Sequence, residues 1–339
     1  MATYKLYKLH FTAPLHIGSP REDDDVSLRT IHSDTLYAAL MACLAKVGTD
    51  LPADGDLGFT LSDAFPYYQK EADSQPVYFL PKPQRVKMPH LDDLSKLKAM
   101  KKVAWIDAAL YADVLVGADP FAAANAQVAY LTKMELPKDI EGNAEDFVRS
   151  EVSQRVTIKS RTGEEDAEPY FVDKIVFIDH AGLYFLAEGD TTLLERALKL
   201  LSLEGIGTDR GVGFGFFDYE QGQLSIDVPA NATHQVSLSL FIPESKAQLE
   251  ALLDSDSGND TDVAYDFVRR GGWITTPPYT TLRKNAIYAF LPGSVFKKTS
   301  SETALGRIVN LRPQIGNLTP DHPIWRMGRA LMLPINIKH

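Results

Sequence analysis

The stretch "LEGIGTDRGVGFGFF", residues 203–217, places five glycines within eleven positions, between a predicted helix and a predicted strand. The helix is "LLERALKLLSL" (193–203), for which Thr192 and Glu195 form a capping box. The strand is "FGFFDYE" (214–220). Because glycine tolerates positive φ and lets a second backbone come close, the stretch predicts a loop with exposed N–H groups that could cradle a phosphate.

The order of elements around this loop does not favour a nucleotide pocket. A P-loop runs from strand to loop to helix and closes with Lys-Ser/Thr, whereas here a helix comes first and that pair is absent. The spacing of the dinucleotide-binding fingerprint is not met either. The loop is therefore predicted to lie along an RNA backbone, with Arg210 at its centre. Phe214 and Phe216 would share one face, and we favour a core position for them over base stacking.

Working outward, the alternation of apolar residues predicts an α+β fold. Strands are expected at 3–12 and 182–189, a helix from Ser33 to Gly48, and hairpins at 64–83 and 155–177, the latter with an acidic tip; residues 90–150 show helical periodicity. After about Gln235 a second unit reads as strand, helix to about Phe267, hairpin and strand. We therefore expect two ferredoxin-like (RRM-like) domains, 1–230 with an insertion at about 85–165, and 231–339.

Composition favours a cytoplasmic protein with one polyanionic partner. The single cysteine, Cys43, lies in an apolar run and excludes both a disulfide framework and a multi-cysteine zinc site, and no apolar run is long enough to span a membrane. The net charge is −10, which taken alone argues against nucleic acid. Residues 269–339, however, hold eleven Lys/Arg and two acidic residues, a net charge of +9 against −19 for the rest.

Two histidines give the chain an alternative function. His16 and His32 could act as general acid and base in a metal-independent endoribonuclease, although structural roles are favoured because the sequence places no partner Lys or Tyr. The acidic run "EDDD" (22–25) is predicted to be a solvated loop and not a metal site. The basic pairs Arg283–Lys284 and Lys297–Lys298 flank a strand and could grip a phosphate backbone.

Several segments, taken together and in order, resemble a known family. The segments are "LHIG", "IHSDTLYAAL", "GLYFL", "GIGTDRGVGFGFF", "LRKNAIYAFLPGSVF" and "HPIWRMGRALMLPI". They are similar to the fourth subunits of the Csm complex, the type III-A CRISPR interference effector, within the RAMP superfamily of RNA-binding proteins. The similarity extends from Leu15 to Ile335 and is weak between about residues 85 and 150.

The resemblance implies a non-catalytic subunit without cofactor or metal. Such a subunit holds the 5′ repeat-derived tag of the guide RNA and lies between the large polymerase-like subunit and the backbone RAMP subunit. The implied motifs are the glycine loop, "SDTL" (33–36), and Arg283–Lys284 with "GSVF" (293–296). The predicted RNA-binding residues are His16, Gly18, Ser33, Asp34, Thr35, Gly205, Gly207, Arg210, Gly211, Gly213, Arg283, Lys284, Lys297 and Lys298.

The chain departs from the family pattern inside the glycine loop. Family loops often carry a basic residue and a serine after the second glycine, and here Thr208-Asp209-Arg210-Gly211 fills that place. Asp209 would repel a phosphate, so it is expected to point away or to pair with Arg210. Two outcomes stay open: Arg210 contacts phosphate, or it is neutralised by its neighbour.

Overall fold

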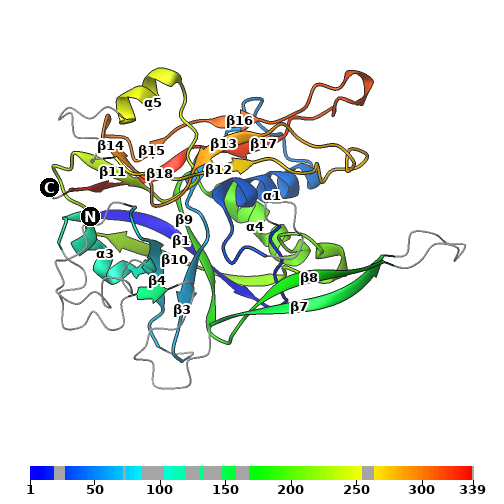
Figure 1. Ribbon diagram of the computed structural model, residues 1–339, viewed down its shortest axis with the longest axis horizontal. Helices are drawn as coiled ribbons and strands as arrows, with labels where there is room; N and C mark the ends of the chain where they lie inside the picture. Colours follow the sequence, from blue (N-terminus) through cyan, green and yellow to red (C-terminus); the bar gives the residue numbers. More distant parts are fainter. Residues whose placement is uncertain are drawn as a thin grey trace, which may run out of the picture.

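A computed structural model describes most of the chain and confirms the α+β class (Figure 1). It describes residues 1–18, 27–71, 74–84, 103–118, 130–132, 147–157, 168–253 and 263–337. The run "EDDD", the acidic tip of the predicted hairpin and much of the insertion lie outside these residues. No helix in the described ranges is long and apolar enough to cross a membrane.

An eight-stranded antiparallel sheet forms the centre of the first half of the chain. The strand order is β10-β1-β9-β3-β4-β5-β6, and β2 also pairs with β9. The strands are β1 (Ala2–Phe11), β2 (Phe59–Leu61), β3 (Phe65–Tyr68), β4 (Val77–Pro81), β5 (Val103–Asp107), β6 (Tyr130–Thr132), β9 (Ala181–Gly189) and β10 (Phe217–Ile226).

Both faces of this sheet are buried, because its central strands carry apolar residues on both sides. Tyr7 and Leu9 of β1 face helices α1 (Ser33–Lys46) and α4 (Thr192–Glu204), which pack on one another. Tyr4 and Leu6 face the opposite way, toward helix α3 (Ala108–Leu115) and a second sheet. The strands of that second sheet, in spatial order, are β14 (Val295–Lys297), β11 (His234–Ser237), β18 (Ala330–Ile335) and β15 (Ala304–Leu305).

The predicted helix caps are each displaced by one residue. The N-cap of α1 is His32, and Ser33, predicted to cap, is the first helical residue, whose hydroxyl accepts from the N–H of Leu240 at 3.1 Å. The N-cap of α4 is Thr191, not Thr192. The Asp190 carboxylate accepts from the Thr192 N–H at 3.0 Å. Because Ser33 reaches Leu240, the start of α1 is tied to the second half of the chain.

The second half differs from a complete ferredoxin-like unit. Its described part contains one α-helix, α5 (Lys246–Leu253). The prediction of helix up to about Phe267 is wrong at its end, because Ala264 forms a bridge with Val295 and Phe267 begins a strand, whereas residues 254–262 lie outside the described ones. The other elements are the hairpins β12 (Phe267–Arg270) with β13 (Ile287–Phe290) and β16 (Ile308–Asn310) with β17 (Trp325–Met327), and a 3-10 turn, η3 (Gly316–Leu318). These hairpins extend over the α1 end of the molecule in Figure 1.

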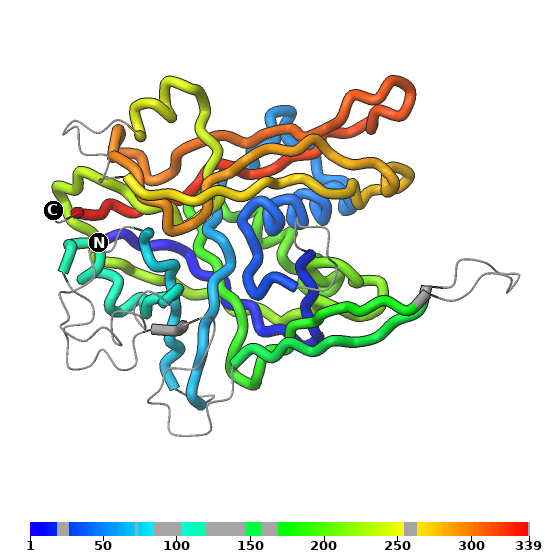
Figure 2. Tube along the Cα trace, in the orientation of Figure 1, coloured from blue at the N-terminus to red at the C-terminus, as the bar shows by residue number. Residues whose placement is uncertain are grey.

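A long hairpin projects from the first half. Strands β7 (Val148–Thr157) and β8 (Glu168–Phe177) pair over their whole length, so the predicted hairpin at 155–177 begins earlier than expected. Figure 2 shows it leaving the lower right of the body. Within the predicted helical region 90–150, the described residues include α3 but also the strand β5, which joins the main sheet.

The two halves are held together by a bidentate ion pair and backbone hydrogen bonds. Arg329 donates two hydrogen bonds to Asp56, at 2.6 and 2.7 Å, and further ones to the hydroxyl of Thr60 and the carbonyl of Phe59. The N–H of Asp63 donates to the carbonyl of Leu238 at 2.9 Å. Charge-assisted, bidentate bonds of this kind fix orientation as well as adding free energy, so the halves meet in one arrangement.

Candidate RNA-binding site

The glycine loop closes on itself and on the segment after β1. It leaves α4 at Gly205, forms a short 3-10 turn, η2 (Arg210–Val212), and enters β10. The Ile206 N–H donates to the Gly215 carbonyl at 2.9 Å, and the Thr208 N–H donates to the carbonyl of His16 at 2.9 Å. The Gly215 N–H donates to the carbonyl of Pro14 at 2.8 Å. These three donors are used inside the protein and are therefore not offered to a phosphate.

The five glycines separate into two groups. The φ angle is positive at Gly205, Gly207, Gly213 and Gly215, but only at Gly205, Gly207 and Gly215 would a Cβ lie 2.5 Å or less from a carbonyl oxygen of the neighbouring backbone. A Cβ at Gly211 or Gly213 would meet no atom within 4 Å. The first group is therefore explained by close packing. Only the tip of the loop, at Gly211 and Gly213, is open to a partner.

Arg155 of β7, and not Arg210, neutralises Asp209. The Arg155 Nη1 lies 2.7 Å from the Asp209 Oδ2, and its guanidinium lies over the Phe214 ring, 5.1 Å from the centroid. No described residue makes a hydrogen bond or ion pair with the side chain of Arg210. The expected pairing of Asp209 with its neighbour is thus replaced by pairing with the hairpin, and Arg210 keeps its charge at the half-exposed tip.

The two predicted histidines are held by different elements. His16 is 4% exposed, and its Nδ1 is bonded to the carbonyl oxygen of Asp173 in β8. His32 is half-buried, and its Nδ1 lies 2.6 Å from the Asp63 Oδ2. Gly18 lies beside the glycine loop, where a Cβ would be 4.0 Å from Thr208. His16 and Gly18 therefore belong to the loop, whereas His32 belongs to the start of α1.

A second set of predicted residues meets at the start of α1, around a buried carboxylate. Asp34 is 2% exposed and accepts from the Nε and Nη2 of Arg270, in β12, at 2.9 and 2.8 Å. The same guanidinium donates to the hydroxyl of Thr35 at 2.8 Å. The Nε of Arg326, in β17, lies 3.8 Å from the Oδ2 of the same carboxylate. Three segments far apart in sequence thus converge on Asp34.

Lys284 is the third basic residue near this carboxylate, and its pKa depends on the charges of Asp34, Arg270 and Arg326. Burial, and then the nearby Arg326, lower the pKa of Lys284 to about 7. Although burial opposes it, the guanidinium of Arg270 holds the pKa of Asp34 well below its usual range. The ionised Asp34 carboxylate therefore faces two arginines, and the Lys284 amine near them is about half protonated at pH 7. We call Asp34, Arg270, Lys284 and Arg326 the Asp34 cluster.

The remaining predicted residues are not in this cluster. Ser33 is fully buried at the junction of the halves. Arg283 is exposed, and its guanidinium lies 4.6 Å from the centroid of the Trp273 ring. Lys297 ends β14 opposite His234, and the Lys298 N–H donates to the carbonyl of Thr233, so this pair lies at the second sheet. Of the residues in the two basic pairs, Lys284 is the one whose pKa is affected by the charge of Asp34 in α1.

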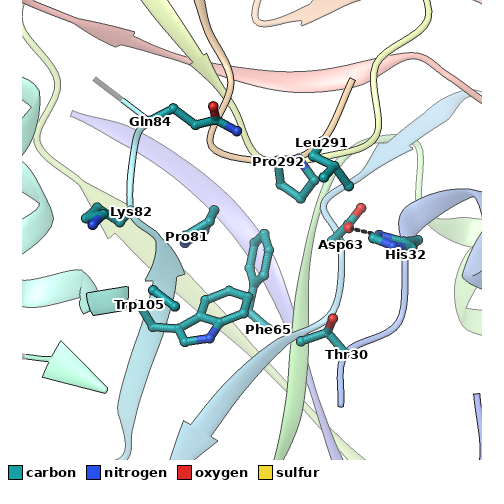
Figure 3. Close-up of a pocket in the computed structure, with 11 residues that line it drawn as sticks. Thr30, His32, Asp63, Phe65, Pro81, Lys82, Gln84, Trp105, Leu291 and Pro292 are labelled. Carbon is teal, nitrogen blue, oxygen red and sulfur yellow. Dashed lines mark hydrogen bonds and ion pairs between the residues drawn. The ribbon is translucent and has the colours of Figure 1, made fainter. Parts of the chain in front are cut away.

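A pocket opens beside the cluster, on the other side of His32 and Asp63. It is a hollow that is open to solvent. Figure 3 shows its walls. Phe65, Pro81 and Trp105 come from β3, β4 and β5, Leu291 and Pro292 from the turn after β13, and Thr30, His32, Asp63, Lys82 and Gln84 supply polar groups. In the described residues no group of three or more His, Cys, Asp or Glu could hold a metal ion.

Sequence reasoning did not single out Arg270, Arg326 or, apart from His32, the residues that line the pocket. Both arginines were counted in the basic segment, yet nothing in their spacing links them to Asp34, from which they are separated by more than 230 residues. The available signal was alternation in "FVRR": Arg270 shares a strand face with Val268, which packs into the core, and a cation on such a face needs a partner.

Comparison with known proteins identifies relatives over the whole chain. Residues 230–335 match the family described as the CRISPR Csm4 C-terminal domain. The chain is 26% identical to the CRISPR system protein Csm4 of Streptococcus thermophilus, with 99% of this chain and all of that protein covered. It is 27% identical to Csm4 of Thermococcus onnurineus, over 78% of this chain and 83% of the relative.

Solved structures show the same fold. A chain from the crystal structure of a Csm1–Csm4 cassette in complex with cA4 matches with a TM-score of 0.60 at 19% identity, covering all of both chains. A chain from a Csm3–Csm4 subcomplex of the type III-A interference complex matches with a TM-score of 0.59 at 16% identity, covering 98% of this chain and 99% of that one. The resemblance to the fourth Csm subunit that the sequence predicts is confirmed.

Proposed function

We propose that the chain is a non-catalytic RNA-binding subunit of a cytoplasmic type III-A CRISPR effector. In this proposal it holds the 5′ repeat-derived tag of the guide RNA and joins the large polymerase-like subunit to the backbone RAMP subunit. The relatives support the assembly, since chains of this fold occur in complexes named Csm1–Csm4 and Csm3–Csm4. The proposal that the chain holds the 5′ tag comes from the family resemblance.

The strand order supports a ferredoxin-like first domain. In chain order, β1, α1, β3, β9, α4 and β10 form a β-α-β-β-α-β unit, and in space its strands lie in the order β10-β1-β9-β3. The insertion then extends the sheet beyond β3 through β4, β5 and β6. We propose that residues 231–339 are a second such domain in which hairpins replace one helix.

The observation that carries the RNA-binding proposal is the gathering of cationic groups at the Asp34 cluster. Two arginines converge on the Asp34 carboxylate, and Lys284, whose pKa is lowered to about 7, lies near them. An anion bound there would favour the protonated form of Lys284 and add to the negative charge that the arginines meet. A phosphodiester of RNA fits because arginine forks bind phosphate oxygens well and because phosphate contacts dominate nucleic-acid affinity.

A nuclease activity is the second candidate, and the pairing of His32 with Asp63 is its support, since a carboxylate orients an imidazole in many acid–base sites. The burial of His16 leaves that histidine without access to a substrate. If the purified chain cleaved repeat RNA without metal and His32→Ala abolished the cleavage, the endoribonuclease would replace the non-catalytic proposal.

Copurification with salt titration tests the main proposal. The chain, expressed with its CRISPR locus, is expected to copurify with other subunits and with a short RNA of constant 5′ end. Lys284→Gln is expected to lower the magnitude of the slope of log K against log[salt] by about 0.7, the value for one contact to single-stranded nucleic acid. Lys246→Gln makes the same chemical change on exposed α5 and is the matched control. Retention of subunits without any RNA would contradict the proposal.

A further inference from the structure

We propose that the pocket between Trp105 and Pro292 receives one unstacked nucleobase of the bound RNA. This inference rests on the proposed function, because the RNA must already be held for one of its bases to enter. It goes beyond that function by assigning a base-reading site to residues outside the Asp34 cluster. The site combines apolar walls, polar ends and a position next to the phosphate-binding cations.

The walls suit a flat ring. Figure 3 shows Leu291 and Pro292 on one side of the hollow and Trp105 with Phe65 on the other. Trp105 is partly exposed, whereas Phe65 is fully buried and packs against it with ring centroids 5.7 Å apart. The accessible surface for stacking is therefore the indole of Trp105, which is held in place from behind. Single-stranded nucleic acids are commonly bound by stacking bases on aromatic side chains.

Strand β5 is irregular at Trp105. The pairing of β5 with β6 shifts register between Val103 and Trp105. Neighbours on a regular strand point to opposite faces, yet Ala104 and Trp105 both line the pocket. Bulges of this kind occur beside functional sites, where they turn a side chain that would otherwise pack elsewhere.

The two ends of the pocket carry hydrogen-bonding groups for a base edge. At one end, the Asp63 carboxylate fixes the Nδ1 of His32, and its other oxygen accepts from the Ser33 N–H at 2.8 Å. At the other end lie Lys82 and Gln84, and burial lowers the pKa of Lys82. Gln84 is exposed, its backbone N–H is bonded to the Gly293 carbonyl, and its side-chain amide has no partner among the described residues. An amide offers both a donor and an acceptor to a base edge.

The pocket and the Asp34 cluster lie on the two sides of one short segment. His32 faces the pocket, and Asp34, two residues later, faces the arginines. Asp63 acts on both sides, since it binds His32 and also raises the pKa of Arg270 by its charge. An RNA phosphate at the cluster would therefore leave a neighbouring base within reach of Trp105.

A scan with a fluorescent base tests the assignment. The RNA that copurifies with the effector is synthesised with 2-aminopurine at single positions and bound to the effector complex reassembled around this chain. Stacking quenches 2-aminopurine, so one position is expected to be quenched in the wild type and to recover its fluorescence with Trp105→Leu. The same variant is expected to bind the RNA about tenfold more weakly. Trp105→Phe retains a ring and is expected to keep the quenching.

Two further variants distinguish an effect on the pocket from an effect on the stability of the fold. Gln84→Ala changes an exposed side chain, so it is expected to reduce the quenching without lowering the melting temperature, whereas Gln223→Ala, on exposed β10, changes neither. Quenching that is unchanged in Trp105→Leu and Gln84→Ala, while the RNA stays bound in a Lys284-dependent manner, would overturn the pocket and leave the proposed function standing. Quenching removed by competing ATP would assign the pocket to a free nucleotide. A wild-type chain that retains no RNA would overturn both proposals.

Discussion

The glycine loop and the Asp34 cluster are both predicted RNA-binding regions, and they are built in opposite ways. In the loop, three backbone donors are bonded within the protein and Asp209 is paired with Arg155. In the cluster, two arginines converge on one carboxylate and Lys284 lies near them. The loop is local in sequence and keeps the charge of Arg210 at its tip, whereas the cluster joins residues 34 and 326 and gathers partly buried cations around one carboxylate.

The difference shows that residues gathered in one motif can be required either by the packing of the fold or by the binding of a ligand. Gly205, Gly207 and Gly215 are required because carbonyl groups lie where their Cβ atoms would be. That requirement belongs to the fold and exists with or without RNA. Unbalanced charge costs free energy in the free protein and is relieved by an anion, so it indicates a ligand more directly than glycine content does. Three predictions test this contrast.

Asp34→Asn is expected to have the largest effect, and it acts on stability. It removes the only carboxylate in direct contact with Arg270 among the described residues and leaves buried cations unpaired. Loss of one partner from a buried ion pair costs about 3–5 kcal/mol. Denaturant unfolding of the wild type and of Asp34→Asn measures the change. If the cluster supplies the charge that RNA relieves, added RNA should restore more stability to the variant than to the wild type, and equal restoration would contradict this.

Gly207→Ala is expected to be the next largest. Its φ is +98°, and a Cβ would lie 2.3 Å from the carbonyl oxygen of His16. A strained backbone of this kind costs about 1–3 kcal/mol. Gly211→Ala, at the open tip, is the matched control and is expected to change the free energy of unfolding by less than about 0.5 kcal/mol. Equal losses at both positions would show that the division of the loop into packed and open glycines is wrong.

Lys284 should give the smallest effect, a pH dependence of opposite sign for stability and for RNA binding. Burial lowers the pKa of Lys284 in the folded chain from 10.5 to about 7. Between pH 7 and pH 10.5 the unfolded chain therefore binds the proton of Lys284 more tightly than the folded chain does. The contribution of Lys284 to the free energy of unfolding consequently increases as pH rises from 7 to 9. A bound phosphate favours the charged amine, so RNA affinity should fall about tenfold over the same range.

Lys284→Arg provides the control for this pH effect, since an arginine stays protonated. Its RNA affinity is expected to be nearly constant between pH 7 and 9. Titration of RNA binding at pH 7, 8 and 9 for the wild type and the variant measures the difference. A wild-type affinity that does not change with pH would place the phosphate away from Lys284.

The sequence predicts the elements better than it predicts their contacts. The strand at 3–12, the helix after His32 and the hairpin around Phe65 follow from local apolar periodicity, and the structure contains them within a few residues. The pairing of Arg155 with Asp209 and of Arg270 with Asp34 joins residues 54 and 236 positions apart, and it depends on tertiary packing. Trp105 was missed because it lies in a region whose helical periodicity concealed a bulged strand.

The junction of the halves sets an order in time for a chain that is synthesised from its N-terminus. Asp34 and Asp56 leave the ribosome early, whereas Arg326 and Arg329, which close on them, come almost 300 residues later. A nascent chain thus contains the carboxylates of the junction long before these cations. The junction closes only when synthesis is nearly complete, and a chain truncated before Arg326 lacks both arginines that join its last strands to the first half.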